Sequence, residues 1–333
     1  MAAVAAQAPL PFIESVSDVV LCERIDSGAS GVVSRALYAG AYTIACKTVQ
    51  VAHMDDGERE RVRRQLCATA RHYAHANIVR YLGVDVHSDA PRAYHLFMEY
   101  FQQTLRSLVH RRAAPFAARV AACFARQLAQ ALSHLHGTLG VVHRDVKSEN
   151  IFMHASPRDE CSWMLKLGDF GESREIAPPT VAPLGGGASG GGATGAECAA
   201  ALLSRRLTPN RGTPEYMAPE MVNLGSANGE EPPTQYTAAV DVWSAGLVLF
   251  EMLSGDVPYR SERINRFALL EHVAGGARPQ WPPSVARPAP GSPGAQLVAL
   301  YEQCTRQRAA ERPSAAALAH TAAAIEHSAL AAR

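Results

Sequence analysis

The strongest constraint on this sequence is a run of charged and polar residues that follows the apolar pair at 141–142, namely His143-Arg144-Asp145-Val146-Lys147-Ser148-Glu149-Asn150. Two further motifs follow it in order: Asp169-Phe170-Gly171, behind a strand-like segment at 164–167, and then GTPEYMAPE at 212–220. A chance match to the five fixed residue types of the first motif has odds of about 10⁻⁷ per position. Three such motifs in one order therefore indicate a single catalytic fold.

These residues resemble the motifs HRDxKxxN, DFG and APE of the protein kinase superfamily, in its serine/threonine class. The resemblance extends from about Val19 to His327. It implies an α+β, bilobal kinase fold, with an antiparallel β-sheet N-lobe that carries one main helix and a mostly helical C-lobe. It also implies ATP as the phosphate donor, Mg²⁺ or alternatively Mn²⁺ as the metal, and proteins with serine or threonine acceptors as substrates.

The resemblance assigns the reacting groups to all three motifs. Asp145 matches the aspartate that accepts the proton of the substrate hydroxyl. Lys147 matches the lysine that contacts the γ-phosphate in serine/threonine kinases, and Thr213 matches the threonine that pairs with the catalytic aspartate. Asn150 and Asp169 match the metal-binding pair, because hard amide and carboxylate oxygens suit Mg²⁺.

The phosphates of the nucleotide are assigned to residues in the N-terminal, strand-rich part. Lys47, within the segment IACK, resembles the strand lysine whose ammonium reaches the α and β phosphates. The loop before it matches the kinase glycine pattern at Gly28, Gly31 and Val33, but Asp26 stands where the first glycine is expected. A carboxylate that points inward there would repel phosphates, so this departure predicts a reduced affinity for the nucleotide.

The adenine ring is assigned to apolar residues and a hinge. Val33, Ala45 and Phe152 would sandwich the ring, and the backbone from Glu99 to Phe101 would meet its edge. Met98 falls at the gatekeeper position just before the hinge. In the absence of a ligand all of these residues would also be ordinary members of a core.

A second departure concerns the helix that follows the lysine strand. Active kinases pair the strand lysine with a glutamate of that helix. The position expected from the spacing to His75 holds Leu66; Glu60 and Glu58 lie further upstream, and Gln65 is close by. Either one of the two glutamates forms the pair, with Glu60 favoured over Glu58, or the pair is missing.

Several residues match supporting positions of the family. His143 and Phe170 match stacked residues of the regulatory spine. Asp241 matches the buried aspartate that holds the catalytic loop, and Arg312 matches the arginine that pairs with Glu220. We expect structural roles for all of them.

The domain organisation follows from the composition along the chain. Residues 1–16 are expected to form a flexible tail, and residues 17–330 a kinase domain with an N-lobe at 17–100 and a C-lobe at 101–330. A Gly/Ser/Ala-rich stretch at about 178–207 predicts a flexible insertion in the activation segment, because it cannot bury enough apolar surface to order itself. We therefore expect no accessory domain within these residues.

Two expectations concern regulation and substrates. Arg144 precedes the catalytic aspartate, an arrangement in which a phosphorylated activation segment is commonly clamped. Thr208 is the first candidate for that phosphorylation, by an upstream kinase or by the protein itself, and Ser204 is the second. Glu149 and Glu251 match positions that hold a substrate arginine in some kinases, which favours basic substrates.

Composition excludes other classes of partner. The chain has 32 Lys and Arg against 31 Asp and Glu, a net charge of +1, so it has no overall field that would attract nucleic acid or an acidic membrane. Its apolar runs are far shorter than the roughly 20 residues of a membrane span. Neither partner is expected.

The cellular location is inferred from the cysteines and the N-terminus. The 7 scattered cysteines form no CxxC pair, which favours a reducing compartment, and the start of the chain lacks the basic flank of a signal peptide. We expect a cytoplasmic or nuclear protein. The bias towards small residues suggests a GC-rich viral or microbial genome, and a viral protein would act in the host cell.

An alternative from another functional class is a pseudokinase, a nucleotide-binding scaffold or regulatory module. Asp26 and the missing helix glutamate favour it. Against it, pseudokinases usually lack the catalytic aspartate, the metal aspartate or the strand lysine, and Asp145, Asp169 and Lys47 are all present. The active kinase is the leading interpretation.

Overall fold

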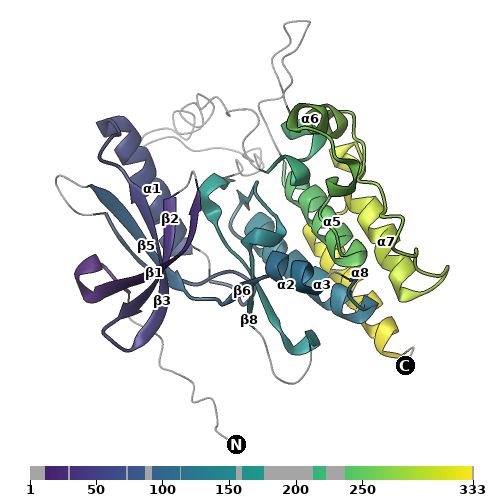
Figure 1. Cartoon of the computed structure of the whole chain (residues 1–333), viewed down its shortest axis with the longest axis horizontal. Helices are drawn as coiled ribbons and strands as arrows, with labels where there is room; N and C mark the ends of the chain where they lie inside the picture. The colour runs from purple at the N-terminus through teal and green to yellow at the C-terminus, as the bar shows by residue number, and fades with distance from the viewer. Residues whose placement is uncertain are drawn as a thin grey trace, which may run out of the picture.

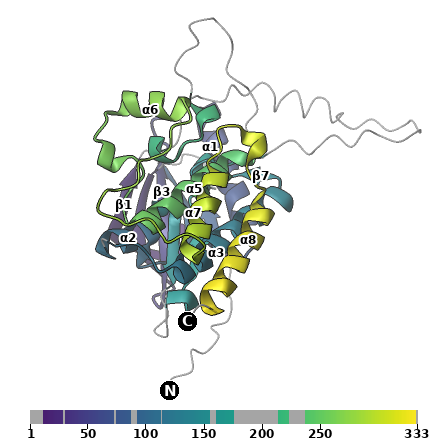
Figure 2. The same cartoon turned by 90° about the vertical axis from the view of Figure 1, so that its right-hand side faces the viewer.

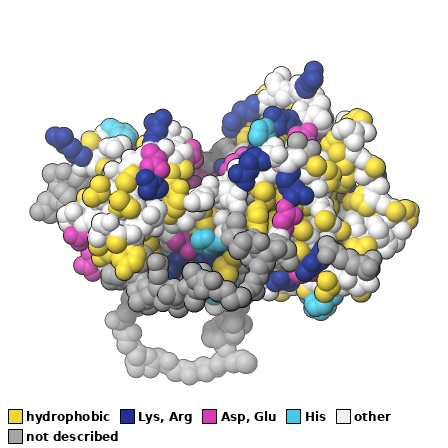
Figure 3. All heavy atoms as spheres, turned by 60° about the horizontal axis from the view of Figure 1, so that its bottom comes forward, with side chains coloured by type: hydrophobic (Ala, Val, Ile, Leu, Met, Phe, Trp, Pro, Cys, Tyr) yellow, Lys and Arg dark blue, Asp and Glu magenta, His cyan; other side chains and the backbone are white. Residues whose placement is uncertain are grey.

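The chain forms two lobes of different character, a sheet-rich one on the left of Figure 1 and a helical one on the right. The computed structural model describes residues 12–28, 31–72, 74–86, 92–112, 114–154, 160–175, 213–222 and 237–331. All statements below concern these residues. The face in Figure 3 is hollowed between the two lobes.

A five-stranded antiparallel sheet makes up most of the N-lobe. Its strand order is β1-β2-β3-β5-β4. The strands are β1 (Val19–Gly28), β2 (Gly31–Tyr38), β3 (Tyr42–Gln50), β4 (Tyr81–Asp85) and β5 (Ala93–Glu99). Buried β-branched and aromatic residues such as Ile44, Val84 and Phe97 form its core, because such side chains pack well on a pleated surface.

One helix, α1 (Asp56–His72), packs on this sheet through Leu66, which is buried against β4 and β5 residues. A capping box begins the helix: the backbone N–H of Glu58 donates to Asp55 Oδ1 at 2.8 Å, and the Asp55 N–H donates to Glu58 Oε2 at 3.2 Å. The charged residues at 59–64 lie on the outer side, where Glu60 pairs with Arg63.

The folded part begins earlier than the expected tail boundary at residue 16. Ile13 is 1% exposed and lies in an apolar cluster with Leu82 and Phe97. Its N–H donates to the Leu82 carbonyl at 2.7 Å. Residues 12–16 are therefore part of the N-lobe, because this apolar side chain closes the outer edge of the sheet beside β4.

The C-lobe is built from six α-helices in its described part. They are α2 (Leu105–Arg112), α3 (Ala118–Gly137), α5 (Ala239–Ser254), α6 (Arg266–Ala274), α7 (Pro293–Cys304) and α8 (Ala315–Ala331). All residues of α5 from Val240 onward are buried, so this helix forms the centre of the lobe. α7 and α8 pack beside α5 and α3 (Figure 2).

Short strands between the lobes position the first two motifs. β6 (Gln103–Thr104), β8 (Ile151–His154) and β9 (Met164–Leu167) form one small sheet, and β7 (Val141–Val142) pairs with β10 (Arg174–Glu175). The catalytic loop lies between β7 and β8, and Asp169 follows β9. The catalytic loop therefore connects the two small sheets, from β7 to β8, and the DFG motif connects them again, from β9 to β10.

This architecture confirms the α+β, bilobal fold expected from the motifs: an antiparallel sheet with one main helix, followed by a mostly helical lobe. Among the described helices, none combines the length and the apolar character that crossing a bilayer requires.

Candidate active site

Asp241 of α5 holds the catalytic loop from below. Its side chain is fully buried and accepts hydrogen bonds from the backbone N–H groups of His143 and Arg144, both at 2.8 Å, and contacts His136 Nε2 at 2.7 Å. Burial alone would raise the pKa of Asp241, but the hydrogen bond and charge of His136 lower it below its ordinary value. The loop is thus fixed by one ionised carboxylate.

Asp145 lies at the centre of a cluster of polar side chains. Lys147 Nζ is 2.9 Å from Asp145 Oδ2, and Asn150 Nδ2 donates to the same oxygen at 3.0 Å. The Thr213 hydroxyl donates to Asp145 Oδ1 at 3.3 Å and accepts from Lys147 Nζ at 2.8 Å. The structure therefore brings three predicted residues from two motifs together around the Asp145 carboxylate.

Lys47 reaches across from β3 to the DFG motif. It is 7% exposed, and its Nζ donates to Asp169 Oδ1 at 2.6 Å. Asp169 has a left-handed backbone, φ 56°, and the Gly171 N–H also donates to its Oδ1 at 3.3 Å. Burial would raise the pKa of Asp169, but the charge of Lys47 and its hydrogen bond lower it.

Neither glutamate expected to pair with Lys47 does so. Glu60 binds Arg63 and Arg64 on the outer side of α1, and Glu58 caps the helix start. Gln65 is the α1 residue that reaches the DFG motif: its amide nitrogen donates to the Gly171 carbonyl. The preference for Glu60 was wrong, because its carboxylate pairs with two arginines of its own helix, whereas Lys47 pairs with Asp169.

The metal-binding residues are oriented by their neighbours. The amide nitrogen of Asn150 donates to Asp145, which leaves its amide oxygen for a cation, and the N–H of Gly168 donates to the Asn150 carbonyl at 2.9 Å. The described residues contain no cluster of three or more His, Cys, Asp or Glu that could hold a metal alone. Asn150 and Asp169 fit Mg²⁺, which is usually held by one or two side chains together with phosphate oxygens and water.

Gly31 must be glycine because of its surroundings. It pairs with Gly28 where β1 and β2 meet, has φ 127°, and an added Cβ would lie 2.5 Å from the Thr48 carbonyl oxygen. The carboxylate of Asp26 is exposed and accepts the Ser27 N–H at 2.7 Å. The aspartate in the first glycine position is therefore held by the backbone N–H of the next residue and is exposed.

The residues assigned to adenine belong to one apolar cluster. Ala45 is buried in it and pairs with Met98 on β5, while Val33, Phe101 and Phe152 pack against it. The rings of Phe101 and Phe152 are 5.4 Å apart. The structure thus brings these side chains together below the glycine loop, and their contact with adenine stays a prediction.

Glu99 uses its side chain within the hinge. Its Oε1 accepts the Arg80 N–H at 2.6 Å and Lys166 Nζ at 2.7 Å. Burial would raise the pKa of Glu99, but hydrogen bonds from His154 and Lys166 lower it. The contact of its backbone with adenine stays a prediction.

The supporting residues lie as expected. The rings of His143 and Phe170 meet edge to face with centroids 4.8 Å apart. Arg312 binds both carboxylate oxygens of Glu220, at 2.6 and 2.8 Å, and stacks over Trp243. These contacts fix the segment that carries Thr213.

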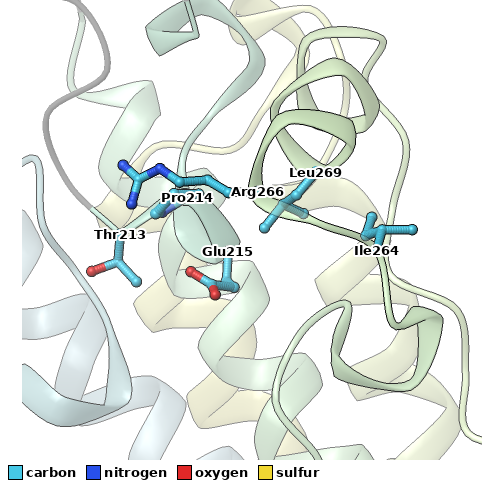
Figure 4. A pocket seen from close by; sticks show the side chains of 6 residues that line it. All are labelled: Thr213, Pro214, Glu215, Ile264, Arg266 and Leu269. Carbon is cyan, nitrogen blue, oxygen red and sulfur yellow. The ribbon is translucent and has the colours of Figure 1, made fainter.

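A pocket of about 390 Å³ opens beside Thr213 (Figure 4). Thr213, Pro214 and Glu215 line one side, and Ile264, Arg266 and Leu269, from α6 and the residue pair before it, line the other. No motif in the sequence pointed to the α6 residues.

Some predicted features lie outside the described residues: Thr208, Ser204 and the Gly-rich stretch at 178–207. Arg144, expected to meet a phosphorylated residue, is 7% exposed with φ 71°. Glu251 is fully buried, Glu149 is partly exposed, and Arg106 of α2 lies between them.

Comparisons with known proteins agree with this geometry. The family model described as protein kinase domain matches residues 20–322. The chain is 27% identical over 91% of its length to "Kinase and exchange factor for Rac B" of Dictyostelium discoideum, covering 24% of that protein. It is 31% identical over 73% of its length to "MAP kinase kinase kinase SSK2" of Saccharomyces cerevisiae, covering 14% of it. It is 29% identical over 89% of its length to "Serine/threonine-protein kinase mos" of Xenopus laevis, covering 73% of that protein.

Proposed function

We propose that this chain, which belongs to the protein kinase family, is an active serine/threonine kinase that transfers the γ-phosphate of ATP to hydroxyl groups of protein substrates. The family uses ATP and a divalent metal; here the metal is Mg²⁺, with Mn²⁺ as an alternative ion. Because the chain spans only 24% and 14% of the first two relatives, its activity and partners are proposed on its own residues.

The arrangement around Asp145 carries the proposal. The carboxylate is oriented by Thr213 and Asn150 and lies 2.9 Å from the ammonium of Lys147. A base that accepts the hydroxyl proton and a cation that faces the transferred phosphoryl group are the two groups that the acceptor side of this reaction needs. The relative named a serine/threonine kinase, together with Lys147, supports that acceptor class.

The donor side relies on Lys47, Asn150 and Asp169. Phosphoryl transfer requires positioning and charge neutralisation more than covalent chemistry from the protein. Lys47 supplies a buried cation for the phosphates, and Asn150 and Asp169 would hold the metal ion, whose charge neutralises the phosphate oxygens. Asp169 already accepts a hydrogen bond from Lys47, which keeps both groups at the cleft.

The test is transfer of labelled phosphate from MgATP to a generic protein substrate, compared with Asp145→Asn. We expect the wild type to exceed this variant by at least about 10²-fold, the usual contribution of a general base. Equal rates would favour the pseudokinase alternative, which is supported by the absence of a helix carboxylate at Lys47 and by Asp26 in the glycine loop. Phosphoamino acid analysis of the product tests the serine/threonine assignment.

Regulation and location are part of the same proposal. Phosphorylation of Thr208, by an upstream kinase or by the chain itself, would be read by Arg144; unchanged turnover of Thr208→Ala would reject this. The protein acts in the cytoplasm or nucleus, of the host cell if it is viral. The free thiols of all 6 described cysteines are consistent with a reducing compartment.

A further inference from the structure

Arg106, in the first turn of α2, lies between two glutamates of the C-lobe. Its Nη1 is 3.2 Å from Oε1 of Glu251, and its Nε is 3.7 Å from Oε1 of Glu149. Glu251 belongs to α5 and Glu149 to the catalytic loop, so the arginine connects three separate segments. The Arg106 side chain keeps 29% of its surface exposed, and that of Glu149 keeps 40%.

Glu251 depends on this arginine for its charge balance. It is fully buried, accepts Tyr216 Oη at 2.5 Å and Ser148 Oγ at 3.0 Å, and has Arg106 as its cation. Burial raises the pKa of Glu251, and the Tyr216 hydrogen bond and the Arg106 charge oppose that rise. An uncompensated buried carboxylate is strongly unfavourable, so a cation at this place is a structural requirement.

The residues around Arg106 adjoin the side of the active site that would bind the acceptor hydroxyl. Glu149 lies four residues after Asp145 in the catalytic loop, and Tyr216 lies three residues after Thr213, which contacts Asp145. A substrate segment with its hydroxyl at Asp145 would pass close to the exposed part of Glu149. Two carboxylates without Arg106 would attract a cationic side chain of that segment.

We propose that Arg106 is a specificity-determining residue that fills this acidic subsite from within the chain, so that the kinase does not select arginine near the phosphoacceptor. The inference rests on the proposed kinase function and replaces the expectation of basic substrates. An arginine of the same chain competes at a high effective concentration, and a second guanidinium would meet like-charge repulsion. Substrates with neutral residues at this position are then accepted as well as basic ones.

The experiment compares peptides that carry arginine or alanine at each position around one serine acceptor. For the wild type we expect kcat/KM ratios within about twofold at every position. Arg106→Ala should raise the ratio about tenfold at one position, because the vacated acidic site is now available to the substrate. The added change Glu149→Gln should remove most of this gain. Arg111→Ala is the matched control, since Arg111 lies on the same helix and donates to Gln103 instead.

Binding of labelled peptides, measured by fluorescence anisotropy, gives the same comparison without catalysis. The binding measurement separates the hypothesis of kinase activity from the hypothesis about Arg106. If no variant transfers phosphate, the kinase proposal fails. The ratio of the affinities for the arginine and alanine peptides still decides the role of Arg106. A wild type that already prefers arginine would overturn the inference. So would a folded Arg106→Ala with unchanged ratios. If thermal unfolding shows that this variant does not fold, Arg106→Ala combined with Glu251→Gln takes its place, because it removes the uncompensated buried carboxylate and keeps the exposed carboxylate of Glu149.

Discussion

On the C-lobe side of the cleft, a buried carboxylate binds two backbone N–H groups of the catalytic loop, whereas on the N-lobe side the helix contributes Gln65 and the glycine loop carries Asp26. On the C-lobe side, the residues named above match the kinase family at every position. On the N-lobe side, two positions differ from the family. The comparison suggests that the part of the site that accepts the proton tolerates little change in this chain, whereas the part that binds the nucleotide uses different contacts.

The largest effect should come from the buried support of the catalytic loop. We expect Asp241→Ala to destabilise the protein by about 3–5 kcal/mol, because it leaves His136 and two buried N–H groups without their acceptor. Chemical denaturation measures this. Asp56→Ala is the control, since its side chain is 97% exposed, and an equal loss in both variants would contradict the assigned role.

This support also predicts a pH dependence. The pKa of Asp241 is lowered from its ordinary value of 3.8 in the folded protein, so its contribution is complete above about pH 4 and is lost as the pH falls through the folded-state pKa. The difference in stability between wild type and Asp241→Asn should therefore narrow in acid. A difference that grows below pH 4 would show that the carboxylate is protonated in the folded state.

On the N-lobe side, we expect Lys47→Met to lower kcat/KM at least about 10²-fold, since a buried cation aimed at the phosphates is removed. The same change leaves Asp169 without the charge that lowers its pKa. Steady-state kinetics with varied ATP measures it. Arg35→Met serves as the control, because that cation lies on the same sheet and pairs with Glu23 at the surface; similar losses in both would break the comparison.

How far the sequence predicts the site depends on whether a residue's neighbours are close in the chain. Asp145, Lys147 and Asn150 lie within one loop, so their spacing alone places them around one point. The helix residue is different. Glu60 and Gln65 are five residues apart, about 140° around an α-helix, so an uncertainty of a few residues in the spacing to His75 decides which side chain is assigned to the site.

Contacts between residues far apart in the chain could not be predicted from the sequence either. Ile13 looks like part of a small, apolar tail, and its burial depends on an edge position of β4 that only the assembled sheet offers. Arg106 reads as one of several arginines of α2. Its partners Glu149 and Glu251 come from elements separated from it by the length of α3 and by the activation segment.

A smaller effect on kcat is expected for substitutions of Gln65. The direction of the change tests whether the contact of Gln65 with the DFG motif matters on the N-lobe side of the site. Gln65 donates to the Gly171 carbonyl, and neither leucine nor a carboxylate can do so. We expect Gln65→Leu and Gln65→Glu each to lower kcat about fivefold, the equivalent of one hydrogen bond of about 1 kcal/mol. If Gln65→Glu instead raises kcat, the helix position is suited to the family's lysine–glutamate pair, and the N-lobe contact described here is secondary.

The smallest effect should come from Asp26, although its chemistry looks the least suitable for a phosphate site. Its carboxylate is exposed and bound to the Ser27 N–H, so solvent and salt screen its repulsion of the nucleotide. We expect Asp26→Asn, which can keep that hydrogen bond, to lower the KM for ATP by no more than about threefold at physiological ionic strength. The change should shrink further in higher salt, because an exposed charge is screened over about 8 Å at 0.15 M. If the KM for ATP instead falls tenfold, or falls equally at all salt concentrations, the Asp26 carboxylate turns inward when the nucleotide binds. The N-lobe side of the site would then differ from the family in its affinity for ATP as well as in its contacts.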